Sequence, residues 1–222
     1  MQKCYALFDF DGTLIRGDSI VSFCRYAHRH GWMNTRALLR AGWMSALYLC
    51  RLTTAEKSKQ AALSFLQGRT QGEVRRFAES FCSDVLLPRL YADGRAEMDR
   101  RRQEGCELWL VSASPSFYLE PLMEPLHLSA VIGTRMHVDE NGVYTGEMLG
   151  ENCRGVEKPL RLAELLAARG EMLDYSGSWA YGDTAGDAPL LMQCAHKRAV
   201  NAKSKLKKAL AGQEGVEYVR FR

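Results

Sequence analysis

Two aspartates, Asp9 and Asp11, follow a short apolar run and stand two residues apart. On an extended chain, residues at this spacing project to the same side, so we expect the two carboxylates to face one point. Asp9 could attack phosphorus as a nucleophile, and Asp11 could protonate the departing oxygen and then deprotonate a water molecule. Gly12 permits a sharp turn beside them, and Thr13 is a further candidate contact for a phosphoryl group.

Four further polar residues could take part in the same chemistry. Ser112 ends a second apolar run and could donate its hydroxyl to a phosphoryl oxygen, and the cation of Lys158 could meet the phosphate. Asp183 could bind a metal ion, and Asp187 could orient Lys158 or a water on the metal. Singly, each has a plainer explanation, such as a helix cap or a solvated lysine. In this order they predict Mg²⁺-assisted phosphoryl transfer. The predicted metal ligands are Asp9, Asp11 and Asp183.

The polar clusters follow runs that read as buried strands and that alternate with helical segments. This alternation predicts an α/β fold with a Rossmann-like parallel sheet, in which ligands lie beyond the carboxyl ends of the strands. The expected strands are 4–10, 106–112, 130–133, 179–182 and, as the last core strand, 198–200; the expected helices are 94–104, 116–126, 159–169 and 188–193. Asn141-Gly142 predicts a hairpin within 136–148. Leu160, Ala163, Leu166 and Ala167 are expected to form the apolar face of helix 159–169.

The segment from Asp18 to Leu87 has a helical pattern without proline and interrupts the sheet after its first strand. We therefore expect a core formed by residues 1–16 and 88–222 and an all-helical cap formed by residues 17–87, which would cover the crevice as a lid. Basic residues of this cap are candidates to contact an anionic substrate: Arg36, Arg40, Arg51, Lys57, Lys59 and Arg69.

The composition of the 222-residue chain limits the classes of function. The formal net charge is +4 and the basic residues are scattered, which does not favour nucleic acid as a partner. An acidic motif stands where a signal peptide would have its apolar region, and no apolar run is long enough to span a membrane, so we expect a cytoplasmic protein. The seven cysteines show no metal-type spacing and are expected to be reduced, several of them buried.

One stretch of the expected cap leaves two interpretations open. Residues 32–52 combine Trp32, Trp43 and several leucines with arginines on both sides. Such a composition is typical of an amphipathic helix that lies in a membrane surface. The simpler interpretation is that these aromatic and aliphatic side chains form the small core of the cap itself.

The four clusters in this order resemble the signature motifs of the haloacid dehalogenase superfamily. Asp9-Phe10-Asp11-Gly12-Thr13 matches the first motif, Ser112 the second, Lys158 the third and Gly182–Asp187 the fourth. The second aspartate of the first motif is the phosphatase form. The helical insert resembles subfamily IB, which contains phosphoserine phosphatases, and Ser112-Ala113-Ser114-Pro115 is similar to a sister branch that includes phosphatidylglycerophosphate phosphatases.

The resemblance implies a Mg²⁺-dependent phosphomonoester hydrolase that forms an aspartyl-phosphate on Asp9 and uses Asp11 as general acid and base. It places Asp18 where the phosphoserine enzymes have a glutamate that contacts the substrate amino group. The expected substrate is a small phosphorylated metabolite such as phosphoserine. The alternatives are a lipid phosphatase acting peripherally at the inner membrane surface and a non-catalytic phosphate-binding protein. The sequence leaves the oligomeric state open.

Overall fold

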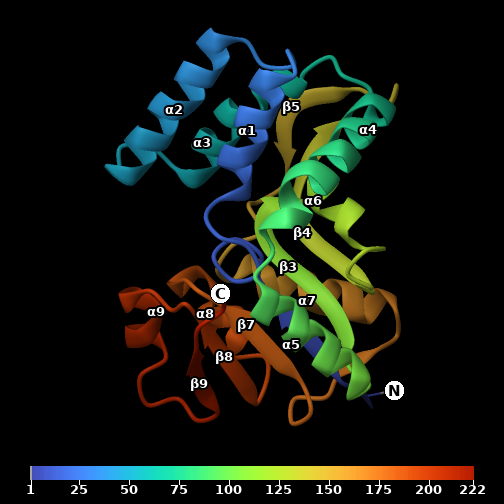
Figure 1. Cartoon of the computed structure of the whole chain (residues 1–222), viewed down its shortest axis with the longest axis vertical. Helices are drawn as coiled ribbons and strands as arrows, with labels where there is room; N and C mark the ends of the chain where they lie inside the picture. Colours follow the sequence, from blue (N-terminus) through green and yellow to red (C-terminus); the bar gives the residue numbers. More distant parts are fainter. Residues whose placement is uncertain (1) are drawn as a thin grey trace.

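The computed structural model describes residues 2–222 and contains a mainly parallel sheet of seven strands in the order β5-β4-β3-β2-β7-β8-β9 (Figure 1). Only β4 and β5 run antiparallel to each other. The strands are β2 (Tyr5–Phe8), β3 (Glu107–Pro115), β4 (Ala130–Val138), β5 (Tyr144–Leu149), β7 (Trp179–Gly182), β8 (His196–Val200) and β9 (Val216–Val219). Two short strands, β1 (Gln2–Lys3) and β6 (Met172–Leu173), form a separate parallel pair. The predicted α/β fold is confirmed.

An apolar layer covers each face of the sheet, so β2 is buried on both sides. Ala6 and Phe8 belong to one core cluster, and Tyr5 and Leu7 belong to the other. Alternation along a strand sends successive side chains to opposite faces. The helix α5 (Ala92–Gln103) packs into the first cluster, whereas α7 (Glu157–Ala168), α8 (Ala188–Leu191) and α9 (Ser204–Ala209) pack into the second.

Four helices lie between β2 and α5, as the helical pattern of this segment predicts. They are α1 (Ser19–Arg29), α2 (Thr35–Leu49), α3 (Ala55–Leu63) and α4 (Gln71–Phe81). Polar side chains at their N-termini accept hydrogen bonds from the first-turn amides and so fix where each helix begins; these residues are Asp18, Asn34, Thr54 and Thr70. Short helical turns at 64–66, 82–86 and 87–89 complete the segment.

Backbone contacts join the helical insert to the rest of the chain at two places within residues 2–222. Where the chain leaves and returns, Leu14 O accepts from Tyr91 N at 2.9 Å, and Ile15 bridges Leu90. At the far end the β4–β5 hairpin contacts the insert, because Thr70 bridges Val143. The hairpin, at the β5 end of the seven-stranded sheet, thus lies beside the helices of the insert (Figure 1). The domain limits at residues 16/17 and 87/88 stay predictions.

Three sequence expectations about elements were wrong in detail. The helix expected over 116–126 is only α6 (Ser116–Leu119), because the chain tightens into a 3₁₀ turn that contains Pro121. The strand expected to be the last is followed by β9. The weak strand at 130–133 continues to Val138, where it pairs with Tyr144 in the predicted hairpin.

Of the four residues expected on the apolar face of α7, Leu166 is buried as predicted, whereas Leu160, Ala163 and Ala167 are exposed. The buried side chains of this helix are Lys158, Arg161, Leu162 and Leu166, whereas Leu160 is exposed. Arg161 donates to Gly133 O at 2.8 Å, and Lys158 donates to Asp9, which follows the carboxyl end of β2. Polar contacts of two buried cations therefore decide how this helix is rotated, and a hydrophobic pattern cannot register them.

Candidate active site

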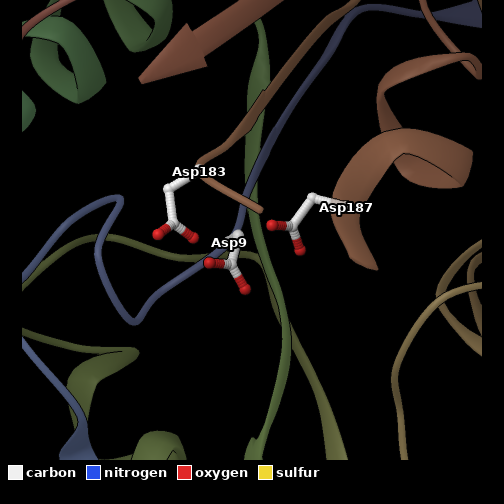
Figure 2. Close-up of side chains that lie close together, drawn as sticks. All are labelled: Asp9, Asp183 and Asp187. Atoms are coloured by element: carbon white, nitrogen blue, oxygen red, sulfur yellow. The ribbon is translucent and has the colours of Figure 1, made fainter. Parts of the chain in front are cut away.

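Three buried carboxylates meet at the carboxyl end of the sheet. Asp9 follows β2, and Asp183 follows β7, which is the parallel neighbour of β2. Asp187 closes the short turn after Asp183. Figure 2 shows the three side chains pointing toward one another, and one oxygen of each lies within 4.8 Å of the others. The strand-end rule therefore brings these predicted residues together.

Lys158 joins two of the three carboxylates. Its Nζ donates to Asp9 Oδ1 and to Asp187 Oδ1, each at 2.6 Å, and the side chain is only 1% exposed. Burial opposes the charged form of Lys158, but Asp187 and Asp9 raise the pKa of this lysine above its usual value. Burial likewise opposes ionisation of Asp187, but Lys158 lowers the pKa of that carboxyl. The lysine predicted to be a phosphate contact is thus also the cation that fixes Asp9.

Burial governs the charge of Asp9. It raises the pKa of this carboxyl to about 8, and the negative charge of Asp187 adds to the effect, whereas Lys158 opposes it. Thr13 Oγ1 donates to Asp9 Oδ2 at 3.1 Å. Thr13 is fully buried, so its hydroxyl orients Asp9.

Asp11 lies in the same cavity but is held by other partners. Its oxygens accept from Ser19 N at 2.6 Å, from Ser19 Oγ at 2.9 Å and from Ser114 Oγ at 2.5 Å. Burial raises the pKa of Asp11 to about 6, with a contribution from the charge of Asp18. A carboxyl group with such a pKa can both give and take a proton near neutral pH. Its carboxylate is outside the group of three, so its role as a metal ligand stays a prediction.

The remaining predicted residues have different positions. Ser112 is buried, lines the cavity and accepts from Ser114 N at 3.1 Å. Asp18 is exposed and accepts from Ile20 N at 2.9 Å as the cap of α1, although it also lines the cavity. Both roles in substrate binding remain predictions.

The carboxylates of Asp9, Asp183 and Asp187 at the carboxyl end of the sheet are suitable ligands for Mg²⁺. Three carboxylates face two ammonium groups, since Lys203 Nζ lies 2.7 Å from Asp183 Oδ2 beside the Lys158 pair. Burial also raises the pKa of Asp183, so a further cation would relieve the crowded negative charge. Gly12, at φ +80°, leaves the space open, because a Cβ there would lie 2.3 Å from Asp183 Oδ2. Hard carboxylate oxygens are the ligands that Mg²⁺ prefers.

The carboxylates line a cavity of about 700 Å³ that extends to the helical insert. Of the six basic residues proposed from the sequence, only Lys59 of α3 lines it. Lys59 Nζ donates to Thr134 Oγ1 at 3.1 Å, to Asn152 Oδ1 at 2.5 Å and to Ala113 O. Burial lowers the pKa of Lys59 to about 8. Sequence reasoning named this lysine as one of six and had no signal to select it, and it missed Lys203.

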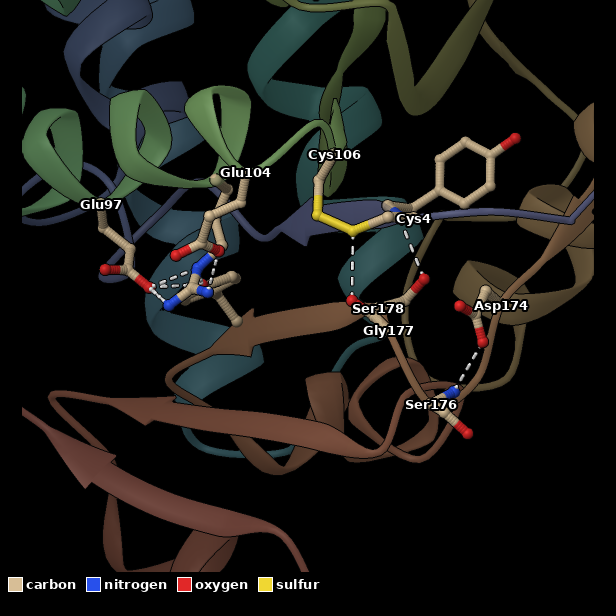
Figure 3. Close-up of a disulfide and its surroundings, with 11 residues drawn as sticks. Cys4, Glu97, Glu104, Cys106, Asp174, Ser176, Gly177 and Ser178 are labelled. Carbon is tan, nitrogen blue, oxygen red and sulfur yellow. Dashed lines mark hydrogen bonds and ion pairs between the residues drawn. A yellow bond between two sulfur atoms is a disulfide. The ribbon is translucent and has the colours of Figure 1, made fainter.

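One expectation about the cysteines was wrong. Cys4 and Cys106 form a disulfide at the starts of β2 and β3 (Figure 3). Tyr5 pairs with Glu107 in the parallel ladder, so the preceding residues stand opposite each other, with their Cα atoms 4.5 Å apart. This register is a tertiary property that the spacing along the chain does not reveal. Among the described residues five cysteines are free, and four of these are buried.

Comparison with known proteins identifies the family. A model described as haloacid dehalogenase-like hydrolase matches residues 6–192. The chain is 32% identical to Protein CicA of Caulobacter vibrioides over 83% of this chain and 80% of that protein. It is 28% identical to a phosphoserine phosphatase of Mycobacterium tuberculosis over 98% of this chain and 70% of that protein. A solved structure of a protein of unknown function from Bordetella pertussis Tohama I has a TM-score of 0.87 and 25% identity, and the similarity covers 99% of both chains.

Proposed function

Since the chain belongs to the haloacid dehalogenase-like hydrolase family and is a phosphatase, we propose that it hydrolyses a phosphomonoester through an aspartyl-phosphate on Asp9. The observation that carries the proposal is the paired contact of Lys158 with Asp9 and Asp187. This contact holds one oxygen of Asp9 and leaves the side chain at the cavity wall, where a phosphate can approach it. A lysine beside the nucleophile also offsets the charge of the transferred group.

The proposed reaction has two displacements. Asp9 attacks phosphorus, the bond from phosphorus to the ester oxygen breaks, and Asp11 gives its proton to the departing oxygen. Asp11 then takes a proton from water, the water oxygen attacks phosphorus, and the bond to Asp9 breaks to release inorganic phosphate. Ser19 and Ser114 hold the Asp11 carboxyl group during both transfers.

The proposed cofactor is Mg²⁺, which would be held by Asp9 and Asp183, with Asp11 as a further predicted ligand and Asp187 orienting Lys158. When bound, it would supply positive charge that screens the substrate phosphate from Asp9. Ser112 and Lys158 would contact the phosphoryl oxygens. These assignments are supported by the grouping of Asp9, Asp183 and Asp187.

The first candidate substrate is a small phosphorylated metabolite such as phosphoserine. It is supported by the similarity to a phosphoserine phosphatase, by the position of Asp18 and by the presence of the Lys59 cation in the cavity. A lipid headgroup phosphate is the second candidate, and exposed apolar side chains on α2 favour it. The alternative of a non-catalytic phosphate-binding protein would require Asp9 to be inert.

The helical insert is proposed to act as a cap that opens to admit substrate and closes to exclude bulk water. The proposed location is cytoplasmic and is supported by the five free cysteines among the described residues. Within residues 2–222 no helix has the length and apolar character to cross a bilayer.

Mg²⁺-dependent phosphate release by wild type and Asp9→Asn tests the proposal. The panel contains phosphoserine, other soluble phosphomonoesters and phosphatidylglycerophosphate in vesicles. We expect Asp9→Asn, which keeps the shape of the side chain, to lose at least about a thousandfold in kcat because it removes the nucleophile. Glu164→Gln, an amide substitution of an exposed carboxylate on α7, is the control and should retain wild-type activity. Activity of Asp9→Asn near the wild-type level would refute the role of Asp9.

A further inference from the structure

Four large apolar side chains are exposed together on or just after α2. The exposed fractions are 69% for Leu39, 65% for Trp43, 80% for Leu49 and 74% for Leu52. In Figure 1, α2 is the outermost helix of the insert, at the edge of the molecule. The interpretation of residues 32–52 as a core for the cap is therefore wrong for these four side chains, although Met33 and Ala41 of the same stretch are buried.

Leu39 and Trp43 belong to a continuous exposed face of the helix. Leu39, Trp43, Ala46 and Cys50 recur at intervals of four, three and four residues, and all four are exposed. Positions at this spacing lie one above another on a helix. Ala41, on the opposite side, is buried toward the rest of the insert. This outer face of α2 has no partner within the described chain.

The charged side chains within this segment all have one sign. From Ser19 to Ala55 the chain has no aspartate or glutamate. Arg36 and Arg40 are exposed beside Leu39 and Trp43, and Arg51 is exposed beside Leu52. A helix with leucine and tryptophan on one face and arginines along it matches the interface of an anionic bilayer, where apolar groups enter the acyl boundary and arginines meet lipid phosphates.

The C-terminal part of α2 reaches the mouth of the cavity. Ser45, Tyr48 and Leu49 line the cavity that contains Asp9, and Ser45 and Tyr48 follow Ala41 on the inner side of the helix. Leu49 lies between this side and the outer face and is the most exposed of the four apolar side chains, so it lies where the cavity meets solvent. A surface that covers the outer face of α2 together with Leu49 would therefore lie next to the opening of the site.

We propose that the outer face of α2, with Leu39 and Trp43 at its centre and Arg36, Arg40 and Arg51 around it, docks on an anionic phospholipid bilayer. The docking would place the cavity mouth at the membrane surface, so an anionic bilayer would be a partner of the proposed active site. Hydrolysis of a phosphate at that surface rests on the proposed function. The binding itself requires no catalysis.

Flotation with vesicles tests the docking directly. The 222-residue chain is mixed with vesicles of phosphatidylcholine or of equimolar phosphatidylcholine and phosphatidylglycerol, and bound protein is measured after centrifugation. We expect binding to the anionic vesicles only. Leu39→Ser/Trp43→Ser should weaken it at least about tenfold, because two apolar side chains that would enter the bilayer are lost. Arg36→Glu/Arg40→Glu should weaken it by a similar factor, because the attraction to anionic lipids is reversed.

A matched double substitution controls for general surface hydrophobicity. Met172 and Tyr218 are exposed apolar side chains in β6 and β9, away from α2. Met172→Ser/Tyr218→Ser should bind vesicles as the wild type does. An equal loss in this variant, or the absence of wild-type binding to anionic vesicles, would overturn the proposal.

Two further measurements separate the alternatives. If a second copy of the chain covers α2, light scattering in solution would show a dimer, and Leu39→Ser/Trp43→Ser would dissociate it. That result would overturn membrane docking. Phosphate release from a soluble ester without vesicles should be the same in this variant and the wild type, because neither residue lines the cavity. A protein that floats but releases no phosphate would refute the proposed function and retain the docking.

Discussion

The two sides of the cavity are built differently. On the sheet side, Asp9, Asp187 and Lys158 are buried and bind one another through charged contacts of 2.6 Å. On the insert side, Lys59 is bound to neutral oxygens, and Tyr48 and Leu49 contribute largely surface groups. Charged groups that neutralise one another hold their places without a ligand, whereas the half-buried cation of Lys59, which contacts only neutral oxygens, has unused capacity for an anion. The difference suggests that the sheet side performs the chemistry and the insert side selects the substrate.

Lys158→Met, on the sheet side of the cavity, should have the largest effect on stability and on catalysis. It leaves two buried carboxylates without their cation, so we expect the free energy of unfolding to fall by about 3–5 kcal/mol. Catalysis should fall at least about a thousandfold, because a charge at the nucleophile is lost as well. Urea unfolding and steady-state phosphate release measure the two effects. Wild-type stability together with wild-type kcat would contradict the contacts of Lys158.

Gly12→Ala should have the next largest effect. The added Cβ would lie 2.3 Å from Asp183 Oδ2, at a backbone φ of +80° that alanine rarely adopts. Displacing Asp183 should reduce kcat about a hundredfold and raise the Mg²⁺ concentration needed for half-maximal activity. The control on the insert side is Gly42→Ala in α2, where the Cβ meets nothing within 4 Å. Equal kinetics of the two variants would refute the tight approach of Gly12 to Asp183.

Lys59→Met is the counterpart of Lys158→Met on the insert side of the cavity, since both replace a lysine by methionine. Its partners are neutral, so no buried carboxylate loses its counter-ion and the fold should persist. We expect KM for an anionic ester to rise about tenfold, with kcat within about threefold of wild type, because the ground state and the transition state lose the same contact. If kcat fell as far as in Lys158→Met, the division between the two sides would be wrong.

The pH dependence of KM should show the smallest effect. With a pKa of about 8, Lys59 is an ammonium group below that pH and is neutral above it. KM for an anionic ester should therefore rise severalfold as the pH passes through about 8, and Lys59→Met should lack this rise. Lys59→Arg should keep the low KM at high pH, because a guanidinium stays protonated. The same rise in all three proteins would assign it to another group.

The sequence predicted the carboxylates and Lys158 of the sheet side but missed Lys203, and it was insufficient for the insert side. Asp9, Asp183 and Asp187 meet because each follows a strand of one parallel sheet, which is a rule about local order and topology. The serines around Asp11 and the contacts of Lys59 depend on how separate elements pack, and no local pattern encodes that. The rotation of α7 was mispredicted for a related reason, since hydrophobicity alone cannot show that Lys158 and Arg161 face inward.

The Cys4–Cys106 bond gives the chain an unusual topology. It spans 102 residues of sequence and therefore closes the helical insert, together with Asp9, into one covalent ring. A protease that cuts the exposed connection at Cys50–Leu52 would open this ring without dividing the molecule. The N-terminal piece, which includes Asp9, would stay attached beside the strand that it pairs with. The nicked protein would separate into two bands on a gel only after reduction.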